Sequence, residues 1–214
     1  MERIDFINNF QVFKENAHVF LVENPNGFYF ERGPRVISSY LEDLLTVYVA
    51  EHLNNPTNKY YVDKAFSYSI KDIVKTCRPD ILVCNDKSKG IAYFDAKTDL
   101  GSHKSSFVDF IHQKNDFIDA IRGKVLSTKI QSDSNKNKQD KIEITICQDV
   151  FYYIIVGGSW AHSSKYQEKY EKALNVCPNV KLSILVDWTT KKGDSFIERE
   201  ADFRKFDEFL NGLL

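Results

Sequence analysis

Three charged residues stand at the ends of two neighbouring apolar segments and are best placed to do chemistry. Asp80 opens the segment 80–84. Asp95, fifteen residues after Asp80, and Lys97 close the next segment, which begins at residue 90. Both segments are rich in strand-forming residues and a turn-rich stretch joins them, which predicts a β-hairpin. Strand alternation then points Asp95 and Lys97 to the same side, with Asp80 facing Asp95 from the adjacent strand.

Two converging carboxylates predict a divalent metal site. They repel each other and raise one another's pKa, and a bound cation relieves this repulsion. Mg²⁺ prefers oxygen ligands and takes only one or two carboxylates together with water and phosphate oxygens, so Asp80 and Asp95 suffice. We expect Mn²⁺ to substitute for it. Lys97 would orient the attacking water or stabilise the charge that develops on a scissile phosphate.

Pro79-Asp80 followed by Asp95-Ala96-Lys97 resembles the PD-(D/E)xK nuclease superfamily, the fold of many type II restriction endonucleases. The resemblance covers roughly residues 37–155 and implies a restriction-endonuclease-like α/β fold with a mixed central sheet flanked by helices. It also implies Asp80, Asp95 and Lys97 as catalytic residues, the two aspartates as metal ligands, and Thr98 on a segment running toward DNA. Aspartate at position 95 replaces the commoner glutamate, which the pattern permits.

Glu42 has two interpretations. The resemblance implies an acidic residue on the helix before the hairpin, which falls on Glu42 and less well on Glu51, and this residue would support the metal. Alternatively, Ser39 and Glu42 fit the S-x-x-E pattern of a capping box, in which the glutamate reaches back to the Ser39 amide. Both remain open from the sequence alone.

Each motif residue also has an ordinary structural explanation. Asp80 suits a turn that begins a strand, and Asp95 with Lys97 suits a solvent-facing pair. We favour the site because all three occur together on predicted strands. Gln113 resembles a helper glutamine of some nucleases but also fits a solvated helix face, and the five histidines, including His103 and His112, lack metal-ligand spacing.

Basic residues suggest where nucleic acid would bind. Residues 121–141 hold six lysines and arginines against two aspartates, a local balance of +4, and phosphate neutralisation dominates nucleic-acid affinity. A solvated loop is the plainer explanation. The predicted nucleic-acid contacts are Arg32, Arg35, Thr98, Lys104, Arg122, Lys124, Lys136 and Lys138.

The elements that would position these residues follow from hydrophobic periodicity. A helix is predicted over 36–53, strands between 60 and 70, the motif hairpin, and a helix after residue 101 with Phe107, Phe110, Ile111, Phe117, Ile118 and Ile121 buried. The polar segment 131–141 predicts a mobile loop, and 142–156 a long strand. A helix at 163–175, a strand at 182–188 and a helix from 201 would form a C-terminal αβα extension. The order αβββαβαβα predicts a mixed sheet covered by helices within one domain, residues 1–214.

Composition narrows the class of protein. Hydrophobic residues make up 43% and charged residues 28% of the 214 residues, which is typical of a globular protein, and the net charge of −1 excludes a global basic field. The first twenty residues resemble neither a signal peptide nor a membrane anchor, and no apolar run is long enough to span a membrane. Four cysteines without C-x-x-C spacing indicate buried thiols in a reducing cytoplasm.

The sequence therefore predicts a Mg²⁺-dependent endonuclease that hydrolyses double-stranded DNA. A type II restriction enzyme acting as a homodimer fits best, since one site cuts one strand and two-fold pairing matches a palindromic site. One alternative is a repair, junction-resolving or phage-defence nuclease that recognises structure. Another is a member that binds nucleic acid or protein without cutting, although such a member has no evident need for all three motif residues.

Overall fold

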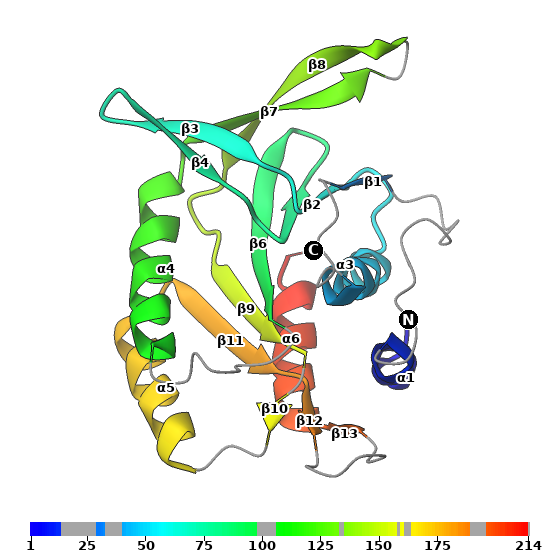
Figure 1. Ribbon diagram of the computed structural model, residues 1–214, viewed down its shortest axis with the longest axis vertical. Coiled ribbons are helices and arrows are strands. Elements are labelled where there is room, and N and C mark those ends of the chain that lie inside the picture. Colours follow the sequence, from blue (N-terminus) through cyan, green and yellow to red (C-terminus); the bar gives the residue numbers. More distant parts are fainter. Residues whose placement is uncertain are drawn as a thin grey trace.

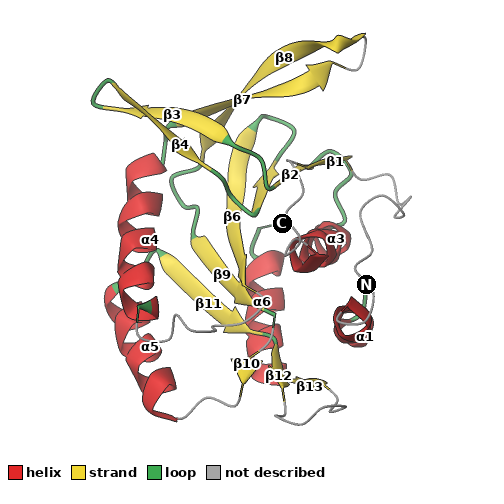
Figure 2. Ribbon diagram, viewed as in Figure 1, coloured by secondary structure: helices red, strands yellow, loops and turns green. Residues whose placement is uncertain are grey.

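A mixed β-sheet with helices on both faces forms the body of the protein (Figures 1 and 2). The computed structural model describes residues 1–13, 29–32, 40–97, 106–132, 135–157, 159–160, 164–188 and 196–213. The helices described are α1 (Arg3–Phe13), α3 (Tyr40–Leu53), α4 (Phe107–Ile121), α5 (Ser164–Val176) and α6 (Glu200–Asn211). The main sheet contains β1 (Tyr29–Arg32), β2 (Lys59–Val62), β3 (Phe66–Ile70), β4 (Ile73–Cys77), β5 (Ile81–Cys84), β6 (Lys89–Lys97), β7 (Val125–Ser132), β8 (Asn135–Ile146), β9 (Tyr152–Val156) and β11 (Val180–Ile184). A small second sheet contains β10 (Ser159–Trp160), β12 (Val186–Trp188) and β13 (Phe196–Glu198).

Strand β6 is the branch point of the main sheet. Along one edge it pairs antiparallel with β5. Along the other edge its first residues pair with β8, and residues 93–97 pair in parallel with β9, which in turn pairs with β11. Beyond β8 the same sheet continues through the antiparallel strands β7, β3 and β4, at the top of Figure 1. Tyr93 and Phe94 of β6 pair with both β5 and β9, and residues 95–97 continue beyond the end of β5 while still paired with β9.

Two hydrophobic clusters cover opposite faces of this central region. On one face, which we call the α6 face, Phe94 of β6 and Tyr153 of β9 pack against residues of α1, α3 and α6. On the other, the α4 face, Tyr93 and Tyr152 pack against α4 and α5. All five residues of β9 are buried, because a strand covered on both faces carries apolar side chains without alternation.

The expected α/β class with a mixed central sheet is confirmed, as are most of the predicted elements. The first predicted helix corresponds to α3, the strands between 60 and 70 to β2 and β3, and the motif hairpin to β5 and β6. In α4 the predicted positions form one stripe, of which Phe107, Ile111, Ile118 and Ile121 are buried, while Phe110 and Phe117 are partly exposed. The αβα order beyond residue 155 is present as α5, β11 and α6, but the single strand expected at 182–188 is divided between β11 of the main sheet and β12 of the small sheet. The single-domain assignment stays a prediction.

Two expectations for the middle of the chain are wrong. The segment 131–141 was expected to be a loop, but most of it lies in the β7–β8 hairpin, where the two strands pair over seven consecutive positions from Val125↔Thr145 to Gln131↔Gln139. The single strand expected over 142–156 is two strands, because the chain turns at residues 147–151 between β8 and β9. The exposed strand β4 was not foreseen.

The cysteine expectation is met in part. All four thiols are free, with Cys84 and Cys177 buried and Cys77 and Cys147 partly exposed. In the described part of the chain, no helix has the length and apolarity needed to cross a membrane.

Candidate active site

The motif hairpin places its charged residues by strand register. Ile81 pairs with Phe94 across β5 and β6, so the next position along the antiparallel ladder sets Asp80 opposite Asp95. The turn that joins the strands is fixed by Asn85, whose side-chain oxygen accepts hydrogen bonds from the backbone N–H groups of Lys87 at 3.0 Å and Lys89 at 3.1 Å. This local closure of the hairpin is what the turn-forming residues of segment 85–89 predict.

Direct contacts join the three motif residues. The Lys97 ammonium donates a hydrogen bond to Oδ1 of Asp95 and lies 3.8 Å from Oδ2 of Asp80. The same Oδ2 atom of Asp80 accepts a hydrogen bond of 2.7 Å from the backbone N–H of Ala96. The two carboxylates therefore share one cation, as the predicted alternation required.

Burial differs among the three side chains. The Asp95 side chain is 9% exposed, whereas Asp80 and Lys97 are 22% and 37% exposed. Solvent therefore reaches the cluster at Asp80 and Lys97. Asp95 forms its inner wall.

The electrostatics of the cluster reflect burial first and the proximity of two carboxylates second. Burial, followed by the charge of Asp95, raises the pKa of Asp80 to about 8, against the opposing effect of Lys97. Burial of the Lys97 ammonium by itself lowers its pKa, but the charges of Asp95 and Asp80 outweigh this, so its pKa is raised. Lys97 is therefore protonated at neutral pH, able to donate hydrogen bonds and not to accept a proton.

Glu42 contributes to the same site electrostatically. It lies in the first turn of α3, and its negative charge acts on both Asp80 and Lys97, raising the pKa of each. This favours the metal-supporting interpretation of Glu42. Ser39, the other half of the alternative capping box, lies outside the described residues.

Tyr152 contacts the motif residues, which the sequence did not reveal. Its buried hydroxyl donates a hydrogen bond to Oδ2 of Asp95, the oxygen that Lys97 does not bind. The contact arises because β9 runs parallel to β6 and Tyr152 pairs with Tyr93. Tyr93 lies two residues before Asp95 on β6, so Tyr93, Tyr152 and Asp95 lie on the same face of the sheet. In the sequence, Tyr152 belongs to a continuous apolar run and carries no sign of this role.

Lys114 on α4 was also missed. Its ammonium lies over the rings of Phe110, Tyr152 and Phe117, at 4.8, 5.2 and 5.8 Å from the ring centroids. The Lys97 ammonium lies 5.6 Å from the same Phe110 centroid. Lys114 thus flanks the cluster on its α4 side. Nearby on α4, Gln113 and His112 are exposed, and the His112 ring contacts the Cys177 sulfur at 3.2 Å.

Two of the predicted nucleic-acid contacts are described in full. Arg122 follows α4, and its guanidinium donates to the Val150 carbonyl at 2.6 Å and to Asn179 Oδ1 at 2.6 Å. It therefore fastens the end of α4 to the turns around Val150 and Asn179, and its contact with nucleic acid stays a prediction. Lys124 is exposed beside a shallow hollow on the β3–β7 surface.

The other predicted contacts are not described at the level of side chains. Arg35, Thr98, Lys104 and also His103 lie outside the described residues. Arg32 lies in β1, and Lys136 and Lys138 lie in β8, but only their backbone is described. These assignments stay predictions.

The donor set suits Mg²⁺ with few protein ligands. Among the described residues, no group of three or more His, Cys, Asp and Glu side chains is arranged to hold a metal ion. The pair formed by Asp80 and Asp95 offers hard oxygen ligands, and Mg²⁺ needs no more than this when water and phosphate oxygens complete its shell. The residues present therefore fit the ion that the sequence predicted.

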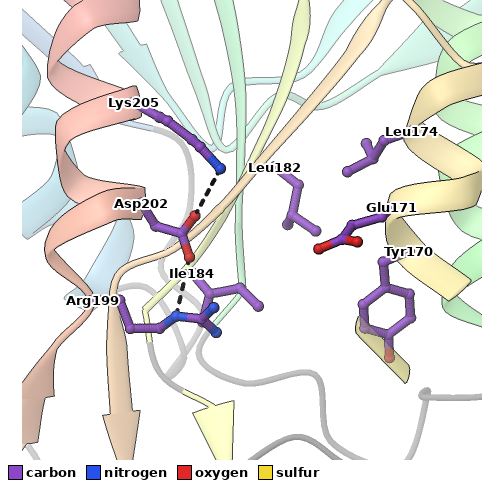
Figure 3. Close-up of a pocket in the computed structure, with 8 residues that line it drawn as sticks. All are labelled: Tyr170, Glu171, Leu174, Leu182, Ile184, Arg199, Asp202 and Lys205. Atoms are coloured by element: carbon purple, nitrogen blue, oxygen red, sulfur yellow. Dashed lines mark ion pairs between the residues drawn. The ribbon is translucent and has the colours of Figure 1, made fainter. Parts of the chain in front are cut away.

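A separate pocket lies at the outer edge of the sheet, between α5 and α6 (Figure 3). Its floor includes Leu182 and Ile184 of β11. Asp202 within it pairs with Arg199 at 3.1 Å and with Lys205 at 3.7 Å, so its carboxylate is already balanced by two cations. The pocket shares no lining residue with the Asp80–Asp95–Lys97 cluster.

Comparisons of this chain with protein-family models, curated proteins and solved structures found no match.

Proposed function

We propose that this protein is a Mg²⁺-dependent nuclease that hydrolyses phosphodiester bonds, and that Asp80, Asp95 and Lys97 form its active site. The observation that carries the proposal is the convergence of these residues: two carboxylates from adjacent strands share one lysine at a solvent-accessible position. Double-stranded DNA is the proposed substrate, and PD-(D/E)xK is the proposed superfamily. The order of helix, hairpin, helix and buried parallel strand around the cluster supports that assignment.

In this proposal the protein residues bind and orient. Asp80 and Asp95 hold the metal ion through their carboxylate oxygens. When bound, Mg²⁺ supplies Lewis acidity toward water and toward the phosphate oxygens. Lys97, protonated and 37% exposed, donates hydrogen bonds to the scissile phosphate and stabilises the negative charge that develops there. Glu42 adds negative charge that favours cation binding.

A cleavage assay tests the proposal. Purified protein is incubated with unmethylated plasmid and phage DNA in Mg²⁺, in Mn²⁺ and in EDTA, beside an Asp80→Asn preparation purified in parallel. Cleavage that needs Mg²⁺ and is absent from Asp80→Asn supports the nuclease. Cleavage of equal rate in both preparations, or in EDTA, contradicts it.

The pattern of products decides between kinds of nuclease. Discrete fragments indicate a type II restriction enzyme, the form that we propose, and a smear or nicks indicate a structure-directed nuclease of the same fold. A restriction enzyme of this size would cut both strands as a homodimer. Light scattering with and without DNA measures that stoichiometry.

A further inference from the structure

Lys114 is held beside the site by aromatic rings. It lies four residues after Phe110 and three before Phe117 on α4, so the three side chains share one side of the helix. The rings of Phe110, Tyr152 and Phe117 all have their centroids within 6 Å of the ammonium, the range of a cation–π interaction. The side chain is partly buried, so its charge has a defined position.

That position is next to the catalytic cluster. Both ammonium groups contact the Phe110 ring, whose centroid is 4.8 Å from the Lys114 ammonium and 5.6 Å from the Lys97 ammonium. Tyr152, whose ring also contacts Lys114, donates its hydroxyl hydrogen bond to Asp95. Lys114 is therefore connected to the cluster through two shared aromatic side chains.

The charge of Lys114 is available, in contrast to that of Lys97. Lys97 pairs with both motif carboxylates, whereas no carboxylate among the described residues forms an ion pair with Lys114. Aromatic faces attract a cation but are weak hydrogen-bond acceptors. The three N–H donors of Lys114 thus remain available to an anion with strong acceptor oxygens.

We propose that Lys114 binds a backbone phosphate of the nucleic-acid strand next to the scissile one. The inference rests on the proposed function and adds a substrate contact to it. Lys97 lies beside the carboxylates and would contact the scissile phosphate. Lys114 lies on α4 and can contact the neighbouring phosphate. A compact lysine cation suits such a contact, because a phosphate presents negative oxygens to a point charge without demanding a fixed plane.

The salt dependence of DNA binding tests this contact. Binding of a 20-base-pair duplex of arbitrary sequence is measured in Ca²⁺ over a KCl series, with the products checked for cleavage. Each phosphate contact contributes about 0.9 to the slope of log K against log salt. Lys114→Met keeps an apolar stem over the rings and removes the charge, so we expect the slope to become shallower by about 0.9 and binding near 0.1 M KCl to weaken about eightfold.

Lys181 offers a matched control. Its ammonium lies 4.4 Å from the Phe151 centroid, but it belongs to β11 beside Tyr153, on the α6 face. Lys181→Met makes the same change of charge and of cation–π contact and should leave the slope unchanged. Lys114→Arg should restore it, and Lys114→Gln is a second neutral variant if Lys114→Met melts at a lower temperature.

The outcomes separate this inference from the proposed function. If wild-type protein binds and cuts DNA but folded Lys114→Met keeps the wild-type slope, the phosphate contact is wrong and the nuclease stands. If wild-type protein neither binds nor cuts, both are wrong. A shallower slope in Lys181→Met equal to that in Lys114→Met indicates a general charge effect and also overturns the contact.

Discussion

Adjacent tyrosines on β9 show how differently the two faces of the sheet use polar groups. Tyr153, on the α6 face, shares a hydrogen bond of 2.9 Å with Ser183, which donates in turn to the Asp202 carbonyl at 3.2 Å. Tyr152, on the α4 face, donates to the carboxylate of Asp95. Both tyrosines are 2% exposed, but the first belongs to a neutral, internally satisfied network and the second to a charged one that reaches solvent.

The contrast extends to the whole of each face. Around Phe94 the α6 face is closed by aromatic contacts with Phe206 and Phe209. Asp95 follows Phe94 on β6 and lies on the α4 face. It is buried, but its neighbours Asp80 and Lys97 are partly exposed. Burying like charges together costs stability unless a counter-charge compensates. The α6 face therefore supplies stability, whereas the α4 face holds two close carboxylates whose repulsion Lys97 opposes without cancelling it.

The largest expected effect is loss of cleavage when the charged cluster is altered. Asp80→Ala or Lys97→Met should reduce the rate at least about 10³-fold, which corresponds to about 4 kcal/mol of transition-state stabilisation. Initial rates on plasmid DNA measure this. Glu168→Gln, which removes a surface carboxylate paired with Lys172 on α5, should cut at the wild-type rate. Full activity in Asp80→Ala contradicts the assignment.

A substitution on the α6 face should affect stability and leave metal binding unchanged. Phe206 is fully buried, and Phe206→Ala should lower the free energy of unfolding by about 3–4 kcal/mol through lost burial and a cavity. Chemical denaturation measures this change. The folded variant should bind Mn²⁺ with wild-type affinity. A weakened metal affinity would show that the two faces are not independent.

The pH dependence of the free energy of unfolding should reveal the cost of burying the Asp80 charge beside Asp95. Because the pKa of Asp80 is raised from its ordinary value to about 8, the folded protein holds a proton between roughly pH 4 and 8 that the unfolded chain releases. This contribution to the stability of the metal-free protein is present below pH 4 and is lost as the pH rises through 8. Asp80→Asn should therefore raise the free energy of unfolding in EDTA at pH 8, by on the order of 1–3 kcal/mol.

Denaturation of wild-type and Asp80→Asn protein at pH 5 and pH 8 checks this sign. The difference between the two proteins should be small at pH 5 and larger at pH 8. A wild-type protein that gains stability relative to Asp80→Asn as the pH rises would contradict the electrostatic account.

The smallest expected effect is a change in metal affinity that distinguishes Tyr152 from Tyr153. Tyr152→Phe removes the hydrogen bond to Asp95 and should weaken metal affinity about tenfold, because a partner that orients a ligand typically contributes at least this much. Tyr153→Phe makes the same chemical change on the α6 face and should leave metal affinity as it is. Calorimetric titration with Mn²⁺ measures both, and equal affinities would remove Tyr152 from the site.

Local patterns were sufficient to predict the motif hairpin and most helices. The turn at Asn85 and the alternation of Asp95, Ala96 and Lys97 depend on residues near one another in the chain. Their convergence with Asp80 follows from one hairpin register. That part of the candidate site was accessible from the sequence because it requires no contact between distant segments.

Long-range pairing accounts for what the sequence did not reveal. Tyr152 meets Asp95 only because β9 pairs in parallel with β6, 57 residues apart in the chain. Lys114 comes close only when α4 packs on the same face. The polar segment 131–141 lacks the composition of a strand, but its residues 135–141 pair with β7 because the register begun at Val125 and Thr145 continues outward.

Metal binding itself tests the central claim most directly. Mn²⁺ is titrated calorimetrically into wild-type protein, Asp80→Asn and Asp95→Asn at pH 8, with Glu168→Gln as the control. The account predicts saturable binding to the wild type and to Glu168→Gln, and affinity at least tenfold weaker in both aspartate variants. Equal binding by all four proteins, or no binding by the wild type, would contradict a metal-dependent site at Asp80 and Asp95.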